Sequence, residues 1–174
     1  MQMKTNQLIS IIAGAMFVFS ASGAHAQKAV TDPLQIKLVR SKVVQDKGRE
    51  VMESAVTARP GEVLEDVATY TNTTKAALKN VEATLPVPAN TELVMASIKP
   101  AAAKASTDGK TFSTMPLKRK VKQANGVEVE TPVPLSEYRY LRWYPGELAP
   151  DKPLAFSARF KVADSPVVPT TAVK

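Results

Sequence analysis

Residues 63–71 read VLEDVATYT, in which apolar and polar side chains alternate at a period of two. The even-numbered positions hold Leu64, Ala68 and Tyr70 together with Asp66. The odd-numbered positions hold valines, threonines and a glutamate. Successive side chains of a β-strand point to opposite faces of a sheet. The stretch is therefore predicted to be a strand that packs one partly apolar face on a core.

Turn signals divide the rest of the chain into similar short stretches. Gly61, Gly109, Gly126 and Gly146 each follow a proline, aspartate or asparagine, and such pairs favour tight turns. Between the turns, alternating or β-branched runs predict further strands at residues 34–38, 51–58, 81–85, 93–98, 112–115, 127–130, 140–144 and 156–162.

No stretch has a sustained helical period. Residues 100–106 (PAAAKAS) are predicted to form a loop with at most one helical turn, because so short a helix is unstable alone. The whole pattern predicts an all-β domain over residues 34–164. We expect an immunoglobulin-like two-sheet sandwich with about eight or nine strands.

The first 26 residues have the features of a cleavable signal peptide. A short segment with Lys4 precedes the apolar run 8–19, which is too short to span a membrane, and Ala24-His25-Ala26 matches a signal-peptidase site. We therefore expect a periplasmic or secreted protein of a Gram-negative bacterium, without a membrane anchor after cleavage. Residues 27–33 are expected to be a flexible N-terminus, and residues 165–174 (SPVVPTTAVK) a disordered tail.

The expected mature chain lacks the side chains that most often perform catalysis or bind metals. The protein has no cysteine, and its one histidine, His25, lies in the segment predicted to be removed. Cysteine and histidine supply the commonest nucleophiles, metal ligands and bases that work near neutral pH. We therefore expect no enzyme activity, catalytic residue, cofactor or metal site. One alternative is a glycan hydrolase that uses carboxylates alone, with Glu128 and Glu130 on a shared strand face.

A basic run is the strongest candidate for binding. Loss of residues 1–26 lowers the formal net charge only from +7 to +6, because Lys4 is the one charged residue removed, and the remaining charge favours acidic partners. The lysines of the run would share one strand face, and the aromatic residues of 140–144 could lie nearby as stacking surfaces. The candidate contacts for a polyanion or a partner are Lys118, Arg119, Lys120, Lys122, Tyr140 and Arg142. The alternative is a solvated edge strand whose lysines prevent aggregation.

Two stretches are similar to a known family. Residues 60–87 contain, in order, Pro60-Gly61, Tyr70-Thr71-Asn72, Asn80-Val81 and Leu85-Pro86. Residues 140–162 contain Trp143, then Leu148-Ala149-Pro150, then a final alternating strand. With the hairpin signal at residues 107–110 between them, these motifs resemble the conserved repeat domain family known as domain of unknown function 11. The chain departs from the family at Asp151, where glycine is usual, and at residues 116–137, which have no clear counterpart.

The resemblance implies an immunoglobulin-like sandwich in a bacterial envelope or surface protein. Four of its residues have structural roles on physical grounds. Tyr70 and Trp143 suit the core of a sandwich or its rim. Asn72 can fold its amide back onto a turn and tolerate a positive φ, and Pro86 can end a strand and keep its edge from pairing.

These observations favour a non-enzymatic exported envelope module, either structural or binding an envelope protein or an acidic glycan. Nucleic acid is not an expected partner outside the cytoplasm. The main alternative is a subunit of a surface fibre or layer, in which residues 34–44 complete a neighbouring subunit by strand addition.

Overall fold

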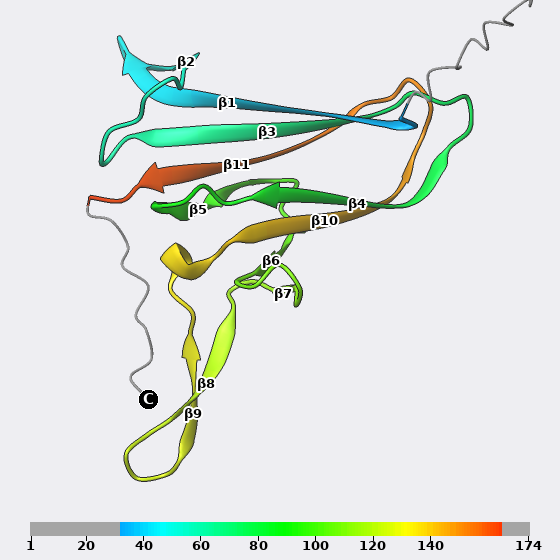
Figure 1. Cartoon of the computed structure of the whole chain (residues 1–174). Coiled ribbons are helices and arrows are strands. Elements are labelled where there is room, and N and C mark those ends of the chain that lie inside the picture. The colour runs from blue at the N-terminus through cyan, green and yellow to red at the C-terminus, as the bar shows by residue number, and fades with distance from the viewer. Residues whose placement is uncertain (1–31, 165–174) are drawn as a thin grey trace, which may run out of the picture. The chain divides into compact units, whose positions relative to one another are not determined.

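The computed structural model describes residues 32–164, and these form an all-β fold of eleven strands and one short 3₁₀ helix. This confirms the predicted all-β class (Figure 1). The predicted signal peptide, most of the predicted flexible N-terminus and the predicted tail lie outside the described residues.

Five strands make the larger sheet, and every neighbouring pair in it is antiparallel. In spatial order the strands are β2 (Arg49–Ser54), β1 (Leu34–Asp46), β3 (Val63–Asn72), β11 (Leu154–Val162) and β5 (Thr91–Lys99). Residues 63–71 thus lie in β3, the central strand of this sheet. Its burial alternates strictly between buried and half-buried along its ten residues, as the period of two predicts.

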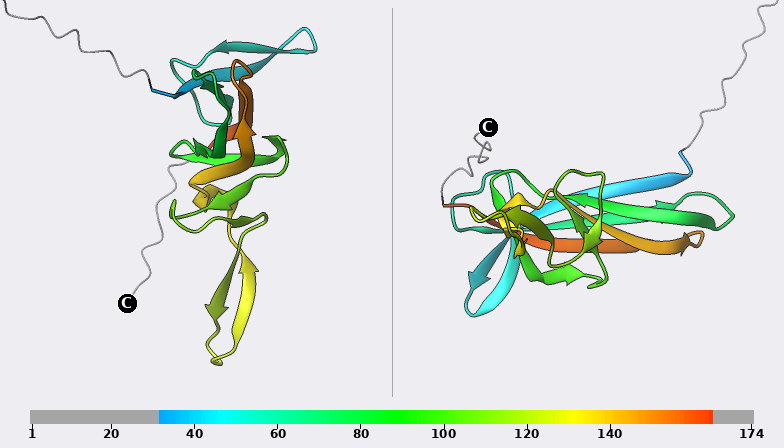
Figure 2. Two further views of the ribbon diagram at one scale, coloured as in Figure 1. Left: turned by 90° about the vertical axis from the view of Figure 1, so that its right-hand side faces the viewer. Right: turned by 90° about the horizontal axis from the view of Figure 1, so that it is seen from below.

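Four strands make the second sheet, in the order β4 (Leu78–Pro86), β10 (Tyr140–Leu148), β6 (Lys104–Ser106) and β7 (Ser113–Thr114). A separate two-stranded sheet pairs β8 (Lys118–Lys122) with β9 (Glu128–Pro132), and the 3₁₀ helix η1 (Leu135–Glu137) leads from it into β10. This β8–β9 hairpin extends away from both larger sheets (Figures 1 and 2).

The core lies between the two larger sheets, as in a β-sandwich. From the larger sheet it receives alternate residues of β3 and β11, and from the second sheet alternate residues of β4 and β10. At its centre the Phe156 ring lies edge-on to Tyr70, with centroids 5.6 Å apart, and 5.2 Å from Trp143. Such aromatic pairs add to the hydrophobic gain of burial.

Several sequence predictions need correction in detail. Residues 104–106, predicted as part of a loop, form β6 because they pair with β10, where Ala105 lies opposite Leu141 in the core. Residues 118–122 form a strand that the count of eight or nine omitted. The first strand runs to Asp46 rather than residue 38, because its antiparallel pairing with β3 extends to Val43 and its pairing with β2 to the turn. The second strand covers Arg49–Ser54 rather than residues 51–58.

Candidate functional site

The β8–β9 hairpin carries the predicted basic run. Every side chain of β8 is exposed, and those of β9 are exposed or half-buried. Only the root is fixed to the core: Leu117 and Val133 are buried, and the backbone N–H of Leu117 donates to the hydroxyl of the fully buried Tyr138 at 2.7 Å. The hairpin is therefore an anchored projection that contributes almost nothing to the core.

Carboxylates neutralise part of the basic run. On one face of the hairpin, Lys118 lies 3.6 Å from Glu130 and Lys120 lies 3.9 Å from Glu128. On the other face, Arg119 donates to the Glu137 carboxylate at 2.6 Å. The structure thus places positive and negative charges in alternation rather than in a purely basic stripe.

The glutamates that suggested a hydrolase are part of this pattern. Glu128 and Glu130 share a face, as predicted, and both are solvent-exposed. Glycosidases hold two carboxylates on either side of the scissile bond. Here both carboxylates come from one strand and face lysines of the neighbouring strand, so the arrangement gives the hydrolase alternative no support.

A hollow of about 210 Å³ lies at the root of the hairpin. Its lining includes Asp108, Arg119, Val133 and Glu137. The Asp108 carboxylate accepts hydrogen bonds from the backbone N–H groups of Thr111 and Lys110 and from Ser106 Oγ, and these lower the pKa of Asp108 to about 2. The Asp108 carboxylate therefore stabilises the turn to which it belongs.

Two predicted contact residues have partners within the second sheet instead of with the lysines. Arg142 donates to Thr84 Oγ1 at 3.0 Å, forms an ion pair with Glu82 at 3.0 Å and lies 3.8 Å above the Phe112 ring. The Tyr140 ring covers Gly109 so closely that a Cβ there would lie 2.8 Å from Cε2. Neither residue is brought against the hairpin cations by any contact among residues 32–164.

The Tyr70 hydroxyl closes the exposed edge of β4. It donates to the Thr84 carbonyl at 3.1 Å and accepts the Thr84 N–H at 3.0 Å. Since β10 is the only described strand beside β4, these backbone groups would otherwise lie open. Pro86 ends the same strand. Both residues therefore protect an edge.

Asn72 and Trp143 stabilise loops at the rim of the core. Asn72 Oδ1 accepts the Thr74 N–H at 2.9 Å, and its Nδ2 donates to the carbonyls of Ala76 and Leu148. Asn72 is not among the described residues with positive φ, so only the folded-back amide of that prediction applies. The Trp143 indole donates to the Pro100 carbonyl at 2.6 Å.

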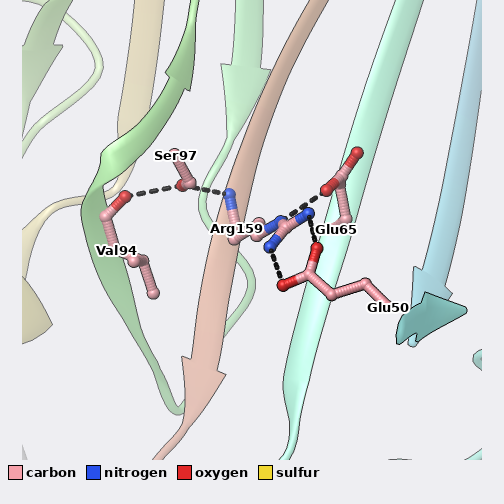
Figure 3. Close-up of polar contacts among 5 residues, drawn as sticks. All are labelled: Glu50, Glu65, Val94, Ser97 and Arg159. Atoms are coloured by element: carbon pink, nitrogen blue, oxygen red, sulfur yellow. Dashed lines mark hydrogen bonds and ion pairs between the residues drawn. The ribbon is translucent and has the colours of Figure 1, made fainter. Parts of the chain in front are cut away.

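An arginine that the sequence did not single out joins three strands of the larger sheet. Arg159 of β11 donates through Nε to Glu65 of β3 at 2.6 Å and through both terminal nitrogens to Glu50 of β2 (Figure 3). Hydrogen bonding to Glu50 and then Glu65 raises the pKa of Arg159, and the same contact lowers the pKa of Glu50. The alternation of residues 156–162 predicted the polar face of Arg159, but no sequence signal gives its partners.

Ser97 repairs a break in the ladder beside this arginine. The pairing of β5 with β11 shifts register between Ser157 and Arg159. The Ser97 hydroxyl donates to the Val94 carbonyl at 2.6 Å and accepts the Arg159 N–H at 2.7 Å (Figure 3). At this bulge the Ser97 side chain therefore accepts the hydrogen bond of the Arg159 N–H in place of a missing backbone carbonyl.

A second ion pair lies on the core-facing side of β3. Arg40 of β1 donates to both oxygens of Asp66, through Nε and one terminal nitrogen, each at 2.7 Å. The Asp66 side chain has no exposed surface, and hydrogen bonding to it raises the pKa of Arg40. The only sign of this pair in the sequence is that Asp66 is a charged residue among the otherwise largely apolar even-numbered positions of residues 63–71.

Within residues 32–164, no group of His, Cys, Asp and Glu side chains could hold a metal ion, and no helix is long and apolar enough to cross a membrane. Comparison with models of known families, with curated proteins and with solved structures finds no match. The resemblance to the conserved repeat domain therefore stays a prediction.

Proposed function

We propose that this protein is a non-enzymatic exported envelope module that contacts its partner through the β8–β9 hairpin. The observation that carries the proposal is an exposed, charged projection fixed only at its root by Leu117, Val133 and Tyr138. A two-stranded hairpin is marginally stable by itself in water. A projection that adds little to the core and yet is built from ten paired residues is well suited to reach another molecule.

The charge pattern of the hairpin favours a protein partner over a polyanion. Lys118, Arg119 and Lys120 each lie beside a glutamate, and only Lys122 has no ion pair among the described residues. A polyanion is attracted by a surface of one sign, whereas a protein surface can match alternating charges one by one. An acidic glycan is the second candidate, supported by the net positive charge of the chain.

The envelope location is supported by the sequence of residues 1–26. The resemblance to the conserved repeat domain gives independent support through one backbone feature: Asp151, at the position where that family usually has glycine, has a φ of 54°. Glycine adopts this left-handed conformation most readily and aspartate is among the few other residues enriched in it, so the position is compatible with glycine in the family.

We also propose that the fold is related to the immunoglobulin sandwich in its layer architecture and not in its exact strand order. This relation is supported by two antiparallel sheets and by connections that cross between them. In the immunoglobulin arrangement the last two strands share a sheet, whereas β10 and β11 lie in different sheets here.

The test is charge reversal on the hairpin, followed by cell fractionation at low salt. The variant Lys118→Glu/Arg119→Glu/Lys120→Glu should lose much of its association with the envelope fraction. The matched control reverses three exposed lysines elsewhere, Lys75, Lys79 and Lys152, and changes the net charge equally. The control should keep its association. Equal losses in both variants would show a general charge effect, and no loss in either would remove the hairpin from the function.

In the fibre-subunit alternative, the strand edges available for pairing between subunits depend on the observed strand order. Residues 41–43 of the expected pairing segment 34–44 lie in β1 between β2 and β3 of the same chain, and Val44 pairs with β2, whereas residues 34–40 pair with β3 alone. If subunits associate by strand pairing at this end of the larger sheet, the available edges are β2 and residues 34–40 of β1.

A further inference from the structure

The sheet edges of residues 32–164 differ in how they are protected. The edge of β4 is closed by the Tyr70 hydroxyl and by Pro86, and β5 carries the bulge that Ser97 fills. β7 has two residues, and β8 presents lysines. These are the usual ways in which proteins prevent edge-to-edge pairing.

β2 has neither proline, lysine nor bulge, and its charged residues are one arginine and two glutamates. Its sequence is REVMES, and its register with β1 is regular from Arg49 to Ser54. All six of its residues are exposed, including Val51 at 40% and Met52 at 45%. β2 is an outer strand of its sheet, with β1 as its only described neighbour.

The open strand is nevertheless held in place. The turn between β1 and β2 is formed by Lys47 and Gly48, both with positive φ (49° and 79°), which is the geometry of a tight two-residue hairpin. Arg159 then ties Glu50 of β2 to the body of the sheet (Figure 3). An edge that is fixed in advance loses little conformational entropy when another strand pairs with it.

We propose that β2 pairs antiparallel with β2 of a second copy of this chain, with Val51 opposite Val51 at the two-fold axis. The pair nearest a two-residue turn exchanges hydrogen bonds, and the ladder then alternates, so the N–H and C=O groups of Glu50 and Met52 face the open edge. In this register they meet Met52 and Glu50 of the second copy. The Val51 pair is then of the non-hydrogen-bonded kind, in which side chains approach most closely.

Charge complementarity selects this register. Arg49 lies opposite Glu53 of the second copy, twice per dimer by symmetry. The in-chain partners continue the alternation, because Asp46 is opposite Arg49 and Lys42 is opposite Glu53. Each cross-sheet row therefore reads acidic, basic, acidic, basic.

The neighbouring registers are less favourable. A shift by two residues in one direction places Glu50 opposite Glu50 of the second copy, and like charges directly opposite are destabilising. A shift in the other direction places Val51 opposite Glu53 and loses the ion pairs. This inference goes beyond the proposed function, since it concerns β2 and not the β8–β9 hairpin.

Charge reversal tests the pairing through its symmetry. We expect residues 27–174 to sediment and scatter light as a dimer. Arg49→Glu or Glu53→Arg alone should raise the dimer dissociation constant by about tenfold or more, because each change affects two cross-strand pairs. An equimolar mixture of the two variants should dimerise again, since both pairs that cross the two-fold axis in the mixed dimer have opposite charges.

A disulfide test reads the register directly. The chain has no cysteine, so Val51→Cys introduces a single thiol, and two such thiols at the axis can be bridged. Val121→Cys on the β8–β9 hairpin is the matched control, since Val121 is also a strand valine and is 41% exposed. We expect rapid covalent dimer formation from Val51→Cys and not from the control.

Three results would overturn the proposal. They are a monomer for the unaltered protein at every concentration, a dimer that survives Arg49→Glu, and equal crosslinking of the two cysteine variants. The reversal variants must keep the thermal unfolding midpoint of the unaltered monomer. If they do not, the cysteine pair decides, because it leaves every charge in place.

Discussion

Replacing Arg40 by methionine would leave the Asp66 carboxylate buried without its ion-pair partner. The unaltered side chain donates to both carboxylate oxygens at 2.7 Å, and the Asp66 side chain has no exposed surface. Methionine keeps an unbranched apolar side chain along β1 but removes both donors. The variant therefore isolates the electrostatic part of the contact.

The expected loss follows from the burial of each partner. Breaking a fully buried ion pair by removing one member costs about 3–5 kcal/mol, because a charge is left uncompensated. The Arg40 side chain is 40% exposed, so water can reach the gap, and we expect a smaller loss. A free energy of unfolding lower by about 2–4 kcal/mol corresponds to a Tm lower by roughly 8–16 °C for a domain of this size.

Urea unfolding followed by the fluorescence of the single tryptophan, Trp143, measures this loss. The control is Lys42→Met, on the same strand and face, which breaks the more open pair with Glu62. We expect a smaller loss there, because the Glu62 carboxylate is partly exposed and keeps its hydrogen bond from the Arg59 N–H when Lys42 is removed. The double variant Arg40→Met/Asp66→Val should recover most of the stability, because no buried charge remains. Equal losses for Arg40→Met and Lys42→Met would refute the reasoning.

Three further expectations concern polar groups that the structure satisfies locally. The depressed pKa of Asp108 contributes stability above its usual value of 3.8 that is lost as the pH falls to about 2, so the acid branch of a pH–stability curve should flatten in Asp108→Asn. Tyr138→Phe should cost about 1–3 kcal/mol in urea unfolding, because the buried N–H of Leu117 loses its acceptor. Ser97→Ala should speed hydrogen exchange at the Arg159 amide in NMR spectra, and unchanged protection would contradict the repair of the bulge.

The period of two predicted the strands that span the sandwich well. β3, β4, β10 and β11 each have one face against a core and the other toward water, and this local pattern is visible in the sequence. The pattern was least informative where strands are short. Residues 104–106 of β6 form a strand because β10 lies beside them. The local sequence does not indicate that these two segments pair.

The candidate site was predicted in part. The exposed basic run at residues 118–122 was identified from its residue types, but its glutamate partners depend on the hairpin register and on η1. Tyr140 and Arg142 were expected near the lysines and instead have partners within the second sheet. Proximity between segments is set by chain topology, which residue types do not encode.

The sequence by itself determined most of the strands and tight turns of residues 32–164, because alternation and turn chemistry act over a few neighbouring residues. The tertiary structure alone decided which strand edges are closed and which are open. Tyr70 reaches Thr84 and Arg159 reaches Glu50 only after the sheets have assembled, across 14 and 109 positions of the chain. A contact between residues so far apart depends on packing and strand order, and for this reason the open edge of β2 could be found only in the folded molecule.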